Sequence, residues 1–126
     1  MNFKFPKKEK LKSKKLIDKL FTEGKSVSKY PFRLVYIKTE LIEEVKVQAG
    51  VSVSKRNFKS AVDRNRIKRL MRESYRLNKN LIFNNISTTY AFMFLYLGKD
   101  MPKNYDEINK NMMKIIKKFI DNEKIL

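Results

Sequence analysis

The 126-residue sequence contains neither cysteine nor histidine. Without cysteine the chain can form no disulfide framework and no thiolate metal site. Without histidine it lacks the commonest general base and the commonest transition-metal ligand. Both absences argue against the usual kinds of catalytic or metal-binding site in the protein itself.

Long apolar runs and chain-breaking residues are also scarce. No stretch approaches the roughly 20 apolar residues that cross a bilayer, and the start, Met1-Asn2-Phe3-Lys4, lacks an apolar run typical of a signal peptide. With only three glycines and three prolines, no segment resembles an interdomain linker. We therefore expect one cytoplasmic domain over residues 1–126, with no membrane partner and no evident obligate protein partner.

Acidic residues are few, 13 against 30 Lys and Arg, which gives a formal charge of +17. A compact domain this basic repels itself, and a polyanionic partner, nucleic acid or an anionic membrane surface, is the usual reason to tolerate the repulsion. Residues 1–15 carry seven lysines and one acid. We expect residues 1–12 to form a basic, flexible arm.

The spacing of apolar residues predicts an α+β fold. Helices are expected over about 14–22, 61–79 and 105–122, with Ser13 and Ser60 as N-caps and Gly24 ending the first helix. Strands are expected over 32–38, 45–53 and 90–97, with a possible further strand before the second helix. The order is α-β-β-β-α-β-α: a single-domain α–β sandwich, one sheet of about four strands with helices mainly on one face. The other face would be free to bind a partner.

The helix over 61–79 separates its charge from its apolar residues. At 100° per residue, one side carries Ile67, Leu70, Met71, Ser74 and Leu81. The opposite side carries Asn65, Lys68, Arg69, Arg72 and Arg76. A solvated face normally mixes Lys with Glu at i, i+4 spacing, whereas this face is nearly all positive and mostly Arg, whose planar fork matches phosphates and base edges. The pattern predicts a nucleic-acid-binding face.

Several short motifs lie in and before this helix: Gly50-Val51-Ser52-Val53-Ser54-Lys55-Arg56, Ala61-Val62, Arg64-Asn65-Arg66-Ile67-Lys68-Arg69, Arg72-Glu73 and Arg76. In this order they resemble the bacterial ribonuclease P protein family, and the resemblance extends over about residues 11–120. It implies an α–β sandwich whose basic helix and preceding loop contact the catalytic RNA subunit. The open sheet face and the first helix would bind the single-stranded 5′ leader of precursor tRNA. The RNA subunit, with Mg²⁺, would cleave the leader off.

Carried onto this sequence, the resemblance assigns an RNA-subunit surface to Lys55, Arg56, Arg64, Asn65, Arg66, Lys68, Arg69 and Arg72. It assigns a leader site to Ile17, Phe21, Arg33, Val35 and Ser52, with Arg33 and Val35 placed by strand parity. Ile17 stands where the family usually has an aromatic residue. Phe21 fits a core position as well as a cleft position on the sequence alone.

No catalytic residue is predicted in the chain itself. The acids are scattered, whereas a metal nuclease needs two or more carboxylates that converge on Mg²⁺. No Gly-rich phosphate loop and no nucleophile–base pair is visible. Two alternatives stay open: a structural, ribosomal-type RNA-binding protein of similar fold, and a self-sufficient metal-dependent ribonuclease. A membrane-surface role is disfavoured because the stripe opposite the arginines is needed for the core.

Overall fold

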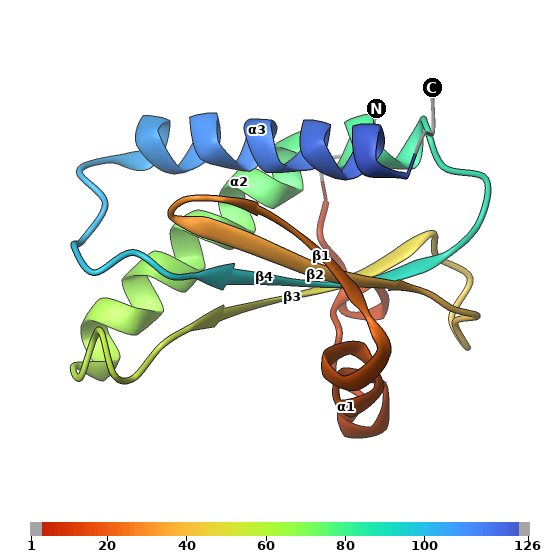
Figure 1. Cartoon of the computed structure of the whole chain (residues 1–126), viewed down its shortest axis with the longest axis horizontal. Helices are drawn as coiled ribbons and strands as arrows, with labels where there is room; N and C mark the ends of the chain where they lie inside the picture. Colours follow the sequence, from red (N-terminus) through yellow and green to blue (C-terminus); the bar gives the residue numbers. More distant parts are fainter. Residues whose placement is uncertain (1–3, 124–126) are drawn as a thin grey trace.

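A computed structural model of the protein describes residues 4–123. A four-stranded sheet lies between α1 on one side and α2 and α3 on the other (Figure 1). The elements in chain order are the 3-10 turn η1 (Lys7–Glu9), α1 (Lys14–Glu23), β1 (Lys25–Lys29), β2 (Phe32–Lys38), β3 (Val47–Val53), α2 (Ala61–Phe83), β4 (Tyr90–Tyr96) and α3 (Tyr105–Asn122). The predicted α+β sandwich, its three helices and its element order are confirmed.

The strands lie in the order β1-β2-β4-β3. β1 pairs antiparallel with β2, β2 pairs antiparallel with β4, and β4 runs parallel to β3. The parallel pair is connected through α2, since antiparallel neighbours can be joined by a tight turn but parallel ones need a crossover. The strand that the sequence left unplaced is β1, which precedes the Phe32 strand instead of following the Val47 strand.

The main core lies between the sheet and the two long helices. Every second residue of β2, namely Phe32, Leu34 and Tyr36, points to this side and is almost fully buried. The ring of Phe119 from α3 packs edge-on against Tyr36 at a centroid distance of 4.8 Å. Helices α2 and α3 therefore cover one face together, which confirms the prediction of helices mainly on one face.

A smaller apolar cluster lies on the other face of the sheet, under α1. Its members are Leu11, Leu20, Val35, Ala91 and Met93. Because β4 contributes alternate residues to both clusters, this strand is buried on both faces. Only part of this second face is covered, since α1 is short and lies beneath one end of the sheet (Figure 1).

Helix α1 begins where its cap residue predicts and ends for a different reason than expected. The Ser13 hydroxyl accepts a hydrogen bond from the Leu16 N–H at 3.2 Å. Gly24 follows the helix with φ −73°, in extended backbone and not in the left-handed conformation of a glycine cap. Its role is steric: a Cβ at Gly24 would lie 2.9 Å from the Tyr36 carbonyl oxygen and closer still to that of Leu20.

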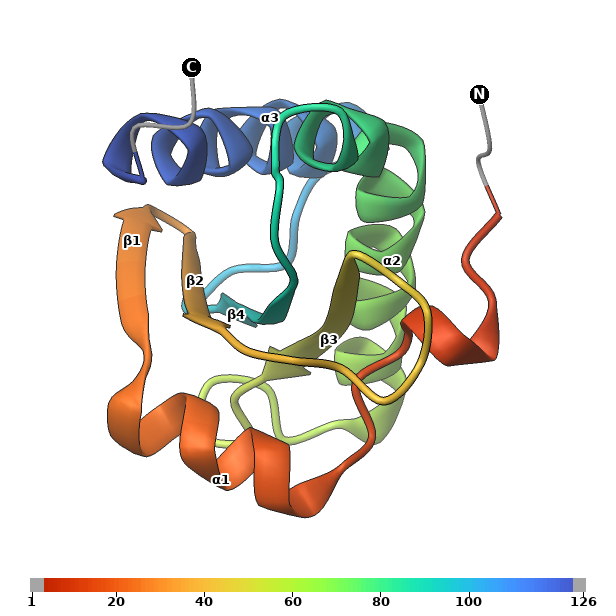
Figure 2. The same cartoon turned by 90° about the vertical axis from the view of Figure 1, so that its right-hand side faces the viewer.

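The segment before α1 has specific contacts along the edge of β3 (Figure 2). Lys10 forms a parallel bridge with Ala49, and the Leu11 N–H donates to the Ala49 carbonyl at 3.0 Å. Lys79 Nζ donates to Glu9 Oε1 at 2.7 Å, and both side chains are buried. A flexible arm is predicted over residues 1–12, and its mobility stays a prediction. The structure adds that several residues between 4 and 11 have partners in the fold, because one acid and one leucine among the lysines can be buried.

Candidate nucleic-acid interface

Helix α2 presents one buried face and one basic face, as predicted. The Ser60 hydroxyl caps it by accepting from the Asp63 N–H at 3.4 Å. Ile67, Met71 and Ser74 are fully buried. On the other side Asn65, Arg66, Arg69 and Arg72 are exposed, and Lys68 and Arg76 are half-buried.

The last two turns of α2 differ from the expected pattern. Leu81, placed on the core side by the helical wheel, is 38% exposed. Tyr75, Lys79 and Ile82 are buried there instead. Lysines usually lie at the surface, so the sequence predicts an exposed Lys79. Lys79 is buried here because Glu9 compensates its charge. The core-facing stripe therefore turns toward Lys79 and away from Leu81.

Arg64, the first arginine of the Arg-Asn-Arg motif, is directed at the protein itself. Its Nη1 donates to the Phe58 carbonyl at 2.8 Å and to the Lys59 carbonyl at 2.9 Å. Arg66, two residues later, is exposed. The two arginines of the motif thus have different surroundings: Arg64 fastens the loop that precedes α2, and Arg66 points to solvent.

The loop before α2 carries Lys55 and Arg56 on its outer side and is held from within. The Arg56 N–H donates to the Ser54 hydroxyl at 3.1 Å. The Asn57 amide donates to the Gly98 carbonyl at 3.4 Å, which ties this loop to the one after β4. Phe58 is buried beside Tyr96. Lys55 and Arg56 are exposed on this fastened loop next to the basic face of α2.

The part of the sheet that α1 leaves open carries a row of aligned residues across all four strands, three of them polar and one, on β4, a leucine. The pairing registers align Ser28 with Arg33, Arg33 with Leu95, and Leu95 with Ser52. Ser28 and Arg33 are exposed and Leu95 and Ser52 half-buried. Two predicted leader residues, Arg33 and Ser52, thus belong to one surface. The Arg33 guanidinium donates to the Ser26 hydroxyl at 3.1 Å, which keeps it along this surface.

The other predicted leader residues separate into exposed and covered positions. Phe21 is 52% exposed, so the alternative that it is a core residue is wrong. Ile17 is half-buried and packs against the cluster under α1. Val35 is only 7% exposed. Strand parity placed it on the correct face, but α1 covers this position, so Val35 does not line an open cleft and that assignment is corrected.

Several carboxylates are engaged in contacts that hold the fold together. Glu73 pairs with Arg76, and the hydrogen bond from the Arg76 guanidinium lowers the pKa of Glu73. Glu123 accepts from the Tyr36 hydroxyl at 2.7 Å. Among residues 4–123, no three carboxylates are close enough to hold a metal ion. Within the same range, no helix has the length and apolar character needed to cross a membrane.

Sequence reasoning missed the contribution of the segment before α1. Lys10, Leu11 and Lys12 line a cavity of about 310 Å³ together with Ile17 of α1 and Arg72 of α2. This segment therefore lies between the helix that carries Phe21 and the basic face of α2. The available signal was Glu9, a lone acid in a lysine-rich stretch, which is more typical of a paired residue than of a mobile arm.

These features define a class of protein: a basic, single-domain α–β sandwich of the nucleic-acid-binding type, with an arginine-rich helix beside a partly open sheet. Within that class, the chain belongs to the ribonuclease P protein family, since the family described as Ribonuclease P matches residues 5–120.

Relatives of known name agree with this assignment. The chain is 43% identical over 99 residues to the ribonuclease P protein component of Porphyromonas gingivalis strain W83, covering 72% of this chain and 70% of the relative. It is 38% identical over 100 residues to that of Clostridium kluyveri, covering 79% and 83%. The RNase P protein from Thermotoga maritima superposes with a TM-score of 0.71 at 21% identity, covering 87% of this chain and 96% of that one. At that identity the superposition shows the shared fold.

Proposed function

We propose that this chain is the protein component of ribonuclease P, which assists removal of the 5′ leader from precursor tRNA. The observation that carries the proposal is the basic face of α2, where five of the exposed or half-buried positions between 65 and 72 are Asn, Lys or Arg and none is acidic. A helix face whose charges are all positive, on a well-packed helix, suits binding to a fixed polyanion. The family relationship favours this function over a ribosomal-type alternative.

The RNA subunit is assigned to the surface formed by Lys55 and Arg56 on the fastened loop and by Asn65, Arg66, Lys68, Arg69 and Arg72 on α2. Most of these side chains are exposed, so their charged groups can displace counterions from RNA phosphates. Arg64 belongs to this surface as the residue that holds the loop in place.

The 5′ leader is assigned to the open part of the sheet and the adjoining flank of α1. The contacts are Phe21, Ile17, Arg33 and Ser52. A half-exposed phenylalanine ring offers a base a stacking platform, and stacking tolerates any leader sequence because every base has a π-face. Arg33 would supply positive charge to the RNA leader, since this residue is exposed and its guanidinium donates to the Ser26 hydroxyl.

Cleavage is assigned to the RNA subunit and its Mg²⁺. The carboxylates of this chain that contact other side chains take part in ion pairs and hydrogen bonds of the fold. The contribution of the protein is then binding: positive charge near the substrate replaces counterions that otherwise hold two RNAs together, so less Mg²⁺ is needed.

The experiment that tests the proposal compares precursor and mature tRNA binding to a holoenzyme reconstituted with the RNA subunit. Phe21→Ala removes the stacking ring. Since a stacked base contributes about 1–3 kcal/mol, precursor affinity should fall about 5- to 150-fold while mature tRNA affinity stays unchanged. Phe21→Tyr should restore it. Met113→Ala, at a partly exposed apolar residue of α3 on the opposite face of the sheet, is the control and should bind like the parent.

Two outcomes would count against the proposal. Equal losses for precursor and mature tRNA, with a strongly lowered melting temperature, would mean that Phe21 supports the fold and does not bind the leader. Mg²⁺-dependent cleavage of precursor tRNA by the protein alone, free of RNA, would place the catalytic centre on this chain.

A further inference from the structure

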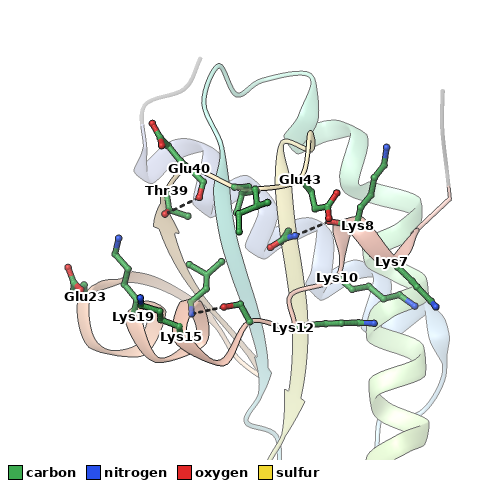
Figure 3. Close-up of a pocket in the computed structure, with 15 residues that line it drawn as sticks. Lys7, Lys8, Lys10, Lys12, Lys15, Lys19, Glu23, Thr39, Glu40 and Glu43 are labelled. Atoms are coloured by element: carbon green, nitrogen blue, oxygen red, sulfur yellow. Dashed lines mark hydrogen bonds between the residues drawn. The ribbon is translucent and has the colours of Figure 1, made fainter.

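A second basic hollow, of about 860 Å³, lies beside α1 (Figure 3). It shares Lys10 and Lys12 with the 310 Å³ cavity that Ile17 lines, and its other lysines do not line that cavity. Its walls are the segment before α1, one flank of α1, and the chain that follows β2. We call it the lysine groove, after the six lysines that line it: Lys7, Lys8, Lys10, Lys12, Lys15 and Lys19.

The lysine groove and the leader surface lie on opposite flanks of α1. Lys15 and Lys19 are one turn apart on the groove side, and Ile17 and Phe21 are one turn apart on another side. Residues two positions apart on a helix differ by about 200° around its axis. Leu20 lies between these two flanks of α1 and is buried against the sheet. An RNA leader stacked on Phe21 therefore does not fill the groove.

The groove has an excess of positive charge, with six lysines against three glutamates in its lining. Glu23, Glu40 and Glu43 also line it, yet in the described range 4–123 no ion pair joins any of them to one of the six lysines. The floor contains Leu16 and Leu41, with no aromatic ring for a base to stack on. A surface with more ammonium groups than carboxylates and no stacking platform suits phosphates and not bases.

The lysines of the segment before α1 are held in place by contacts with distant parts of the chain. Glu9 pairs with Lys79 of α2 at 2.7 Å, in a position where both side chains are at least nine-tenths buried. The Gln48 amide of β3 donates to the Lys8 carbonyl at 3.0 Å. The Leu11 N–H donates to the Ala49 carbonyl. One wall of the groove is thus built into the fold at three points.

We propose that the lysine groove binds the phosphates of an RNA strand, and that the buried Glu9–Lys79 pair positions the groove's lysines for this. The inference rests on the proposed function, in which two RNAs meet this protein. The phosphates come either from leader nucleotides beyond those at Phe21 or from the RNA subunit. Both sources present the same chemistry, a flexible or structured ribose-phosphate backbone.

The effect is large enough to measure. For single strands, the dependence of log affinity on log salt is about 0.7 for each phosphate neutralised, which corresponds to about fourfold in affinity per contact at about 0.15 M salt. Removing two such contacts should therefore weaken binding about fifteenfold and reduce the salt slope by about 1.4.

The test uses the reconstituted holoenzyme and three double variants. Lys15→Gln with Lys19→Gln removes two groove charges on α1. Lys110→Gln with Lys114→Gln is the matched control, because these lysines have the same i, i+4 spacing and are exposed on α3, across the sheet. Arg69→Gln with Arg72→Gln tests the α2 face. Each is measured for affinity to the RNA subunit and to precursor tRNAs with short and long leaders, over a range of salt.

The outcomes separate the two sources and the two proposals. A loss that grows with leader length places leader phosphates in the groove, and an equal loss for the RNA subunit and all substrates places the RNA subunit there. If the groove variant matches the α3 control while the α2 variant loses affinity, the groove proposal is wrong and the proposed function stands. If the α2 variant also binds like the control, the proposed function fails with it.

The positioning role of the buried pair has its own readout. Glu9→Gln should reduce the salt slope in the parent protein but cause no further reduction when Lys7, Lys8, Lys10 and Lys12, the groove lysines on the segment that Glu9 holds, are already Gln. A purely structural role would lower the melting temperature and affect affinity equally in both backgrounds. That additive result would overturn the assignment of Glu9 as a positioning residue.

Discussion

The structure predicts that the two arginines of the Arg-Asn-Arg motif will respond differently to substitution, because their surroundings differ. Arg64 donates two hydrogen bonds to loop carbonyls, at 2.8 and 2.9 Å, whereas Arg66 is exposed. We expect Arg64→Ala to destabilise the fold and loosen the Lys55–Arg56 loop. We expect Arg66→Ala to leave the stability unchanged and to weaken RNA binding directly.

The magnitudes follow from the contacts. A hydrogen bond with a charged partner contributes about 1.5–3 kcal/mol. Both bonds come from one nitrogen, Nη1, of a half-exposed side chain, so we count them together and expect a total loss of roughly 2 kcal/mol in the free energy of unfolding. For a domain of this size that lowers the melting temperature by roughly 5–10 °C. Arg66→Ala should cost about fivefold in affinity for the RNA subunit near 0.15 M salt and reduce the salt slope by about 0.9.

Thermal unfolding and salt-dependent RNA binding, measured on both variants, distinguish the two roles. Arg64→Lys is the informative control, because a lysine keeps the charge but lacks the planar guanidinium whose Nη1 donates to both carbonyls. It should recover part of the lost stability at most. The reasoning would be refuted if Arg64→Ala unfolded at the parent temperature and reduced the salt slope as Arg66→Ala does, since Arg64 would then contact RNA and not the loop.

Two further predictions concern the fold. Gly24→Ala should lower the melting temperature strongly although the backbone at Gly24 suits any residue, because the added Cβ meets the Leu20 and Tyr36 carbonyl oxygens; an unchanged melting curve would contradict the steric argument. Burial, reinforced by the hydrogen bond to Glu123, raises the pKa of Tyr36 from 10.0 to about 12. Because the folded state disfavours the phenolate, this contribution to stability is complete below pH 10 and is lost as the pH rises through about 12. Denaturant unfolding at pH 9 and pH 11 should show the decline, and Tyr36→Phe should make it shallower.

The sequence predicts those elements whose own residue pattern or composition indicates a helix or a strand. Helix α3 alternates its apolar and polar residues at helical spacing, and both of its ends lie where the pattern places them. Strand β2 is rich in branched and aromatic residues and is found at the predicted bounds. Strand β1 was not placed, because its sequence Lys-Ser-Val-Ser-Lys has one apolar residue. It is a strand because β2 offers it an edge to pair with.

The candidate site is likewise predicted in part. The basic face of α2 follows from helical spacing alone, and the structure agrees most clearly at Asn65, Arg69 and Arg72, which are exposed. Strand parity gave Val35 the correct face but could not reveal the helix above it. The directions of Arg64 and Lys79 depend on partners six and seventy residues away. Such choices are made by tertiary contacts, which local patterns do not encode.

The segment before α1 also covers part of one edge of the sheet. A sheet ends in strands whose outer N–H and C=O groups are unpaired, and such edges invite pairing between molecules. On the β3 side, the Lys10–Ala49 bridge and the Leu11 hydrogen bond occupy part of that edge. On the opposite side, β1 is only five residues long and carries a lysine at each end. Both borders of the sheet are thereby made poor templates for aggregation, a safeguard that matters while the chain has yet to meet a partner.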